Sequence, residues 1–273
     1  MKIFSLYTDF FKFLEKISPY SEKWPVYFED YYKPHQVFFE NYFSHFPLID
    51  FSSLKERVEA IKPSDYAGVI NLVAFCPPEP IIREAYEKCS AVVPPKKEVE
   101  VYLFIGFFSP DAFVMDIGER PVICFGLERF KDFRLLKILF AHEYAHFLLN
   151  LSRGEVPEEK KIKWLILSEG ISTYFSSLIF PDCPLPDHFL FRRDRFNWCQ
   201  AHERYLREIF CSEKFSSQEL MDYYFKGNPE LDIPPRAAKY LGFEAVKNYL
   251  GQNKDTALKS LLSDKEIVLS LEL

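Results

Sequence analysis

The most informative motif of the sequence is His142-Glu143-Tyr144-Ala145-His146. It reads H-E-x-x-H and lies in a largely apolar run, 130–153, that contains no Gly or Pro, which predicts one helix of about five turns or more. Residues four apart share a helix face, so His142 and His146 are expected to direct two imidazole nitrogens at one point. The carboxylate of Glu143, one position round, is better placed to reach a metal-bound water than the metal itself. The pattern predicts a metal site, with a hydrogen-bonded His pair in the core as the alternative.

A third ligand is predicted on the next apolar segment. Trp164 to Phe175 reads as a second helix, and Glu169 is the carboxylate in its middle, 169 − 146 = 23 positions after the second His. An acid flanked by Leu167 and Ile171 is costly to bury unless it is paired or bound to a metal. Glu169 is therefore the predicted third ligand. An ion pair with Lys or Arg on a half-exposed face is the alternative.

These residues carry a resemblance to known families. Leu149 and Ser152 replace the Gly and third His of a metzincin, so that class is excluded. H-E-x-x-H followed by a helix bearing E-G resembles the gluzincin metallopeptidases, whose third ligand is a Glu on the next helix. A longer resemblance, over about Val99 to Leu250, is to the DUF2268 family of predicted zinc-dependent proteases. It looks strongest in the strings A-H-E-Y-A-H, L-S-E-G-I-S-x-Y-F and P-P-R-A-A-K-Y-L-G-F-E-A-V-K-N-Y-L.

The resemblance implies roles for particular residues. His142, His146 and Glu169 would be the ligands of one zinc ion per chain, and Glu143 would be the general base. Some gluzincins place an acid four positions after the ligand Glu to orient a His. Thr173 stands there in this chain, which puts that supporting hydrogen bond in doubt.

Hydrolysis at a zinc site passes through a tetrahedral intermediate with a negatively charged oxygen. This oxyanion is expected to need a hydrogen-bond donor in addition to the zinc ion. With three protein ligands, the fourth zinc position would hold a water whose pKa the metal lowers, and Glu143 would take its proton. Tyr240 is the first candidate donor, because many gluzincins use a Tyr in the corresponding stretch. Arg236 could assist or bind a substrate carboxylate. His188 and His202 are alternatives, and the competing interpretation is a packed Tyr240 and a surface Arg236.

Composition indicates which classes of binding partner to exclude and where in the cell the protein is expected. A formal charge of −6 across 273 residues, without a basic cluster, argues against nucleic acid and anionic membrane as partners. The six Cys form no C-x-x-C pair, and their mostly apolar surroundings predict reduced, buried thiols. No apolar run reaches about 18 residues, and 1–10 does not look like a signal peptide. A cytoplasmic location is expected, and the sequence makes no prediction of oligomeric state.

The element pattern predicts an α+β, zincin-like fold in a single catalytic unit. Residues 1–155 would form an α/β lobe that ends in the H-E-x-x-H helix, and 156–273 a mainly helical lobe that carries the third ligand, with zinc between the two. Helical spacing is seen at Ile3, Leu6, Phe10, Phe13, Leu14 and Ile17. Further helices are expected over 26–46, 51–61, 81–89, 196–210, 217–225 and 237–250. Strands are expected over 69–75, 99–108, 112–117 and 121–125.

Pro121 to Phe125 is the candidate edge strand, because a Pro at its start suits an edge. Gluzincins hold an extended peptide against such an edge by backbone hydrogen bonds. The alternative is an ordinary interior strand.

The predicted function is a zinc metallopeptidase acting on peptides or small proteins. Two alternatives stay open from the residues. One is a zinc hydrolase of a non-peptide amide, and the other is a catalytically silent zinc-bearing binding or regulatory module on a gluzincin scaffold. An intact Glu143 argues against the module, because a purely structural site has no need of that acid.

Overall fold

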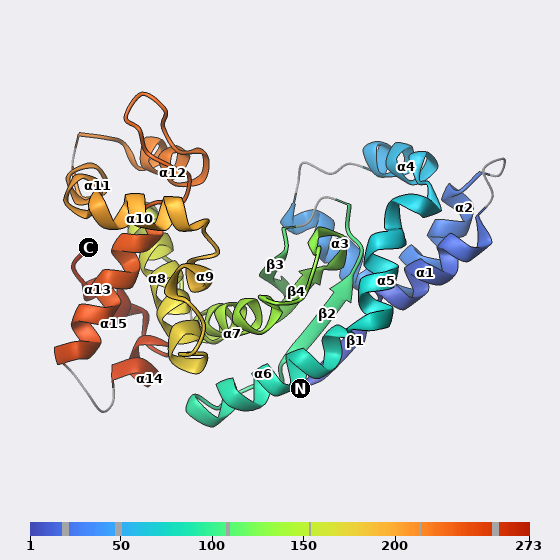
Figure 1. Ribbon diagram of the computed structural model, residues 1–273, viewed down its shortest axis with the longest axis horizontal. Helices are drawn as coiled ribbons and strands as arrows, with labels where there is room; N and C mark the ends of the chain where they lie inside the picture. The colour runs from blue at the N-terminus through green and yellow to red at the C-terminus, as the bar shows by residue number, and fades with distance from the viewer. Residues whose placement is uncertain (18–21, 47–50, 108–109, 153, 213, 253–256) are drawn as a thin grey trace. The chain divides into compact units, whose positions relative to one another are not determined.

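The computed structural model describes residues 1–17, 22–46, 51–107, 110–152, 154–212, 214–252 and 257–273. The chain divides into two compact units, Met1–Ser90 with Pro94–Glu143, and Ala91–Val93 with Tyr144–Leu273. Figure 1 shows a small mixed sheet among the helices of the first unit and helices throughout the second. The α+β class predicted from the sequence is confirmed. The boundary between the units falls inside the H-E-x-x-H motif, and the lobe boundary after residue 155 stays a prediction.

The sheet of the first unit has the strand order β1-β2-β4-β3. The strands β1 (Lys2–Ser5), β2 (Glu100–Phe104) and β4 (Arg120–Gly126) run parallel, and β3 (Ala112–Ile117) pairs antiparallel with β4. The register sets Val101 beside Ile123. Both side chains are fully buried, as expected for a strand covered on both faces.

The candidate edge strand is an interior strand. β4 has β2 on one side and β3 on the other, so β1 and β3 are the edges. Every residue of β4 after Arg120 is buried. Pro121 is tolerated because it stands at the second position of the strand, opposite Asp116 near the end of the antiparallel ladder.

The first unit also contains helices. They are α1 (Tyr7–Lys16), α2 (Trp24–Tyr27), a π-helical turn Phe28–Tyr32, a 3-10 turn Lys33–His35, α3 (Gln36–His45), α4 (Phe51–Ala60), a 3-10 turn Pro63–Tyr66, α5 (Ala67–Phe75) and α6 (Pro78–Val92). Aromatic side chains of α3 pack against the sheet. Phe38 stacks on Tyr102 with ring centroids 4.8 Å apart. The buried Tyr31 hydroxyl donates to the Ile105 carbonyl and accepts from the Ile105 amide, at 3.0 and 2.9 Å, so the backbone just after β2 is satisfied.

Two predicted elements are wrong. The stretch 69–75, predicted as a strand, belongs to α5, in which the buried Val69 and Val73 are four residues apart. A short run of apolar residues has no period that separates a strand from a helix. Ile3, counted with the first helix, lies in β1, because pairing with a strand about 100 residues away overrides the local spacing. The predicted strand 99–108 ends at Phe104 in β2, and Phe108 lies outside the described residues.

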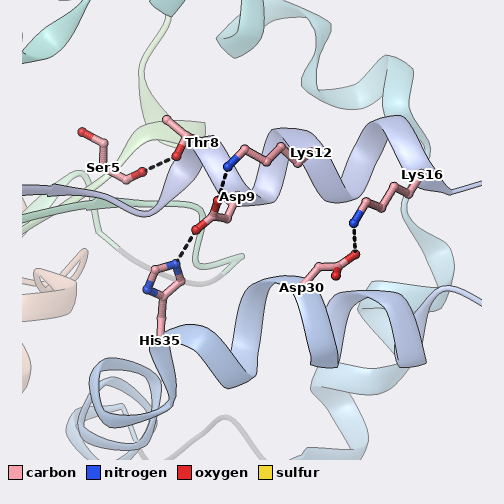
Figure 2. Close-up of polar contacts among 7 residues, drawn as sticks. All are labelled: Ser5, Thr8, Asp9, Lys12, Lys16, Asp30 and His35. Atoms are coloured by element: carbon pink, nitrogen blue, oxygen red, sulfur yellow. Dashed lines mark hydrogen bonds and ion pairs between the residues drawn. The ribbon is translucent and has the colours of Figure 1, made fainter.

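Ion pairs connect α1 to the segment that follows α2. Figure 2 shows the Asp9 carboxylate between the Lys12 ammonium and the His35 ring, at 2.7 and 2.9 Å. The Lys16 ammonium lies 2.9 Å from the Asp30 carboxylate. Burial would raise the pKa of Asp9, but the hydrogen bonds from Lys12 and His35 outweigh it and hold the pKa of this carboxyl below its usual range.

The second unit is built around a pair of helices. Its elements are a 3-10 turn Glu158–Lys160, α8 (Lys161–Ile179), α9 (Leu185–Phe189), α10 (Arg193–Ala201), α11 (Glu203–Phe210), α12 (Ser217–Lys226), α13 (Lys239–Gln252), α14 (Ala257–Leu261) and α15 (Lys265–Ser270). α8 and α13 lie side by side (Figure 1). The core is formed by residues that include Ile166, Phe189 and Leu241.

The remaining sequence predictions concern cysteines and membrane spans. All six Cys are free thiols, as predicted. Burial was predicted too broadly, because Cys211 is exposed while Cys89, Cys124 and Cys199 are buried. None of the helices in the described part of the chain combines the length and apolar character that crossing a membrane requires.

Candidate metal centre

Two helices carry the predicted ligands. α7 (Leu136–Ser152) holds His142 and His146, and it is one continuous helix across the boundary between the units. α8 holds Glu169 near its middle, as the third residue of the motif L-S-E-G. The predicted helix over 130–153 begins later, at Leu136, and Arg153 lies outside the described residues.

The three predicted ligands converge. One donor atom from each of His142, His146 and Glu169 lies within 4.8 Å of the others. The Nε2 atom of His146 is 3.5 Å from Oε1 of Glu169. Ligands held at about 2.1 Å from a tetrahedral zinc ion lie about 3.4 Å from one another, so this pair already has the spacing of two zinc ligands. The residues present therefore fit a divalent ion.

Glu143, which follows the ligand His142 in the sequence, is buried. Its exposed fraction is 6%, and it faces Cys124 of β4 closely enough to influence the thiol. Burial, and then the negative charge of Glu143, raise the pKa of Cys124 well above its usual range. Cys124 is thus a neutral thiol, and it is not among the convergent donors. The general-base role of Glu143 stays a prediction.

A buried lysine pairs with the third ligand. The Lys239 ammonium, at the first position of α13, lies 3.2 Å from Oε2 of Glu169. Lys239 is 2% exposed and the Glu169 side chain 19%. Burying a lysine is costly unless its charge is compensated, and Glu169 supplies that compensation. The ion pair that the sequence offered as the alternative is therefore present, and Glu169 also has the spacing of a metal ligand.

Two glycines allow this approach of α13 to α8. A Cβ atom on Gly170 would lie 2.1 Å from the backbone carbon of Gly242, and one on Gly242 would lie 2.0 Å from the Ile166 carbonyl oxygen. Because both clashes are with backbone, no side-chain rotation relieves them. Gly170 directly follows Glu169, and Gly242 comes three residues after Lys239, so this close helix crossing places the ion pair.

Two further residues lie near Glu169. The Thr173 hydroxyl donates to the backbone carbonyl of Glu169 at 2.8 Å, as a helical threonine commonly does. The Tyr224 hydroxyl is buried and makes no hydrogen bond among the described residues. Burial, and then the Glu169 charge, raise the pKa of Tyr224 well above its usual range, so it stays protonated.

The predicted oxyanion donors lie at or just before the start of α13. The Tyr240 ring packs on Phe189 and Phe196, with centroids 5.9 Å away in both cases. Burial first, then the nearby acids with a hydrogen bond to Glu244 among them, raise the pKa of Tyr240 to about 12. Arg236 is exposed and takes a left-handed backbone conformation, with φ of 61°, in the turn before α13. The role of Tyr240 and Arg236 as oxyanion donors stays a prediction.

The two alternative histidines, His188 and His202, have contacts of their own. His188 is buried, with Nδ1 3.1 Å from the Ser176 hydroxyl. His202 stacks on Trp198 at 4.3 Å and is exposed.

Sequence reasoning missed Lys239 and Tyr224. The signal that marked Glu169 was a charge within an apolar run, and the same signal exists for Lys239 in Ala237-Ala238-Lys239-Tyr240-Leu241. Nothing comparable marks Tyr224, since a tyrosine among aromatic neighbours is common in any core.

Comparison with known proteins adds one finding. Residues 141–270, from just before His142 to the end of α15, match a single family model. This stretch is similar to the gliding motility protein GldB. The match to GldB spans all three convergent ligands and Lys239. No curated protein and no solved structure matches the chain significantly.

The GldB match corrects the functional prediction. The H-E-x-x-H region matches a gliding motility family and not a peptidase family, so the gluzincin and DUF2268 assignment is wrong. The metallopeptidase, protease and hydrolase assignments are wrong with it, and nothing in the match supports either of the two alternative functions. The physical reason is that ligand types and spacing determine where a metal ion can bind, whereas they do not determine which reaction, if any, follows.

Proposed function

We propose that this chain binds one zinc ion per chain through His142, His146 and Glu169. The convergence of their three donor atoms within 4.8 Å is the observation that supports it. Two imidazole nitrogens and one carboxylate oxygen suit zinc, with cobalt and manganese as substitutes in vitro. When bound, the ion would supply a fixed divalent charge that joins α7 to α8.

We infer further that the chain acts in a process related to gliding motility. The match to GldB supports this, because the matched residues contain the whole candidate site. The helices α7 and α8, which carry the candidate ligands, would be the part that serves this process. The zincin-like architecture and a peptide or small protein as partner, rather than nucleic acid or membrane, stay predictions.

Location is part of the same proposal. The sequence predicts a cytoplasmic protein, whereas the matching family model is that of a GldB lipoprotein, which favours association with a membrane. Fractionation of cells into membrane and soluble material separates the two. Recovery in the membrane fraction that resists a high-salt wash supports a GldB-like location, and recovery in the soluble fraction supports the sequence prediction.

Metal content tests the site directly. Protein purified without chelator should contain about one zinc per chain. We expect His146→Ala and Glu169→Gln to lose it, because each removes one of three ligands and Glu169→Gln keeps the shape of the side chain. His202→Ala is the matched control, since His202 is exposed and outside the site. Wild-type protein that takes up no zinc, or a His146→Ala variant that retains it, would refute the assignment.

Surface movement tests the motility role. Deleting the gene in its host should reduce movement of cells over agar, and wild-type protein should restore it. Complementation with His146→Ala should fail, whereas His202→Ala should succeed. Unchanged movement of the deletion strain would overturn the motility role and leave the metal measurement standing on its own.

A further inference from the structure

The two oxygens of the Glu169 carboxylate have different partners. Oε1 lies 3.5 Å from Nε2 of His146, on the side of the candidate metal site. Oε2 lies 3.2 Å from the Lys239 ammonium. A carboxylate can bind a metal ion through one oxygen or through both. Here the second oxygen already has a cationic hydrogen-bond donor.

Lys239 is held firmly in this position. It is 2% exposed and opens α13, and its amide donates to the Arg236 carbonyl at 3.0 Å. The Arg236 amide in turn donates to the Tyr224 carbonyl at 2.6 Å, which fixes the start of α13 to α12. The backbone contact between Gly170 and Gly242 prevents α13 from moving along or away from α8 without losing its packing.

We propose that Lys239 is the positioning residue of the metal site, which holds Oε2 of Glu169 so that Glu169 binds the ion through Oε1 alone. This inference rests on the proposed zinc site. Two histidines and one carboxylate oxygen leave a fourth tetrahedral position open. The ammonium also offsets the carboxylate charge, so Lys239 limits how strongly the site attracts a cation.

The two effects of Lys239 make distinct predictions for two variants. Lys239→Met removes both the hydrogen bond and the charge. Glu169 then binds through both oxygens, so coordination number rises and affinity for the ion increases, by about tenfold from the loss of charge repulsion. Lys239→Gln removes the charge but keeps an N–H donor for Oε2. Its affinity should rise as well, while its coordination number stays that of the wild type.

Cobalt(II) reports coordination number without any assay of activity. Four-coordinate cobalt absorbs strongly in the visible range, and absorption weakens as coordination number rises. We would titrate wild type, Lys239→Met and Lys239→Gln with Co²⁺ and measure the visible spectrum and the dissociation constant. The expected result is strong bands in the wild type and in Lys239→Gln, and bands at least about twofold weaker in Lys239→Met, with tighter binding in both variants.

Other outcomes separate the possible failures. Wild-type protein without cobalt bands, or a His146→Ala variant with the same bands, means that the zinc site itself is wrong. Strong bands in Lys239→Met, or weak bands already in the wild type, overturn the role of Lys239 while the zinc site survives. A merely structural lysine would predict weaker binding in both variants, which also contradicts the proposal. If Lys239→Met does not fold, the dissociation constant of Lys239→Gln still tests the charge effect: tighter cobalt binding than in the wild type supports the proposal, and equal or weaker binding overturns it.

Discussion

At the scale of residues, the partly buried charge of Glu169 requires a compensating positive charge nearby. Its side chain is 19% exposed, and the Lys239 beside it is almost fully buried. Two such groups are stable together because each compensates the other, and the removal of one leaves the other charge poorly solvated. The metal site is thus coupled to an ion pair that matters to the fold even without metal.

Glu169→Ala should lower the free energy of unfolding in the presence of a chelator, by about 3 kcal/mol, because it leaves the Lys239 charge without its carboxylate. Urea denaturation monitored by circular dichroism measures the change. Glu203→Ala, which breaks the more exposed pair with Arg207, is the control and should change the free energy of unfolding by about 0.5 kcal/mol. Equal losses in the two variants would show that Lys239 does not need Glu169.

The Asp9 carboxyl makes stability depend on pH in a defined direction. Its folded-state pKa is lowered, so its contribution is present above the unfolded-state pKa of about 4 and is lost as pH falls through the folded-state value. Asp9→Asn should therefore reduce the free energy of unfolding by about 0.5 kcal/mol at pH 7 and by nothing measurable at the lowest pH at which the protein folds. Denaturation curves at a series of pH values test this. If the difference in unfolding free energy between wild type and Asp9→Asn stays constant across the pH series, the contacts of Asp9 with Lys12 and His35 in Figure 2 are not its source.

At the scale of elements, the crossing of α8 and α13 sets the site. The helices meet backbone to backbone at Gly170 and Gly242, where any side chain would force them apart. Close packing of this kind tolerates no added volume without a shift of the whole helix. The E-G pair on α8 is explained by this contact.

Gly242→Ala should destabilise the protein by about 3 kcal/mol, because the steric cost of the methyl group exceeds the gain of about 1 kcal/mol in helix propensity. Gly251→Ala is the control in the same helix. No atom lies within 4 Å of its Cβ position, so the substitution should be neutral or stabilising. Thermal melts of both variants measure the contrast. An equally stable Gly242→Ala would mean that the helices do not cross this closely.

Sequence reasoning worked for elements with a strong local pattern and failed where distant contacts decide. The helices that carry His142, His146 and Glu169 were predicted because long apolar runs without Gly or Pro have one common outcome. β1 was missed because four residues pair with β2, almost 100 positions on. The strand predicted over 69–75 is helical, since its apolar residues fit either period.

The three candidate ligands could be predicted from the sequence, whereas the residues that surround them, such as Lys239, could not. The spacing of the histidines follows from helix geometry alone. The pairing of Lys239 with Glu169 depends on how α13 crosses α8, and 239 − 169 = 70 positions separate the two residues. The chemistry was overpredicted, because the same donors serve metal binding with or without a reaction.

At the scale of the whole molecule, metal binding should couple to folding. An ion that binds the native ligand set but not the unfolded chain stabilises the fold by about 2.7 kcal/mol when its free concentration is 100 times the dissociation constant. Added zinc should raise the melting temperature of chelator-treated protein by several degrees. His146→Ala should show no such rise. A rise that persists in this variant would place the stabilising ion elsewhere.

The second unit is not a continuous segment, and this affects how the protein can be cut. Ala91–Val93 belong to it, and the buried Tyr144 hydroxyl donates to the Val93 carbonyl at 2.8 Å. A fragment trimmed to the GldB-like residues 141–270 would lack that acceptor and the last turn of α6. Losing a buried hydrogen bond costs about 1–3 kcal/mol, a large share of the stability of a small domain. We therefore expect the GldB-like stretch alone to be unstable, and we expect truncation libraries to recover soluble C-terminal products only when these start upstream of Ala91.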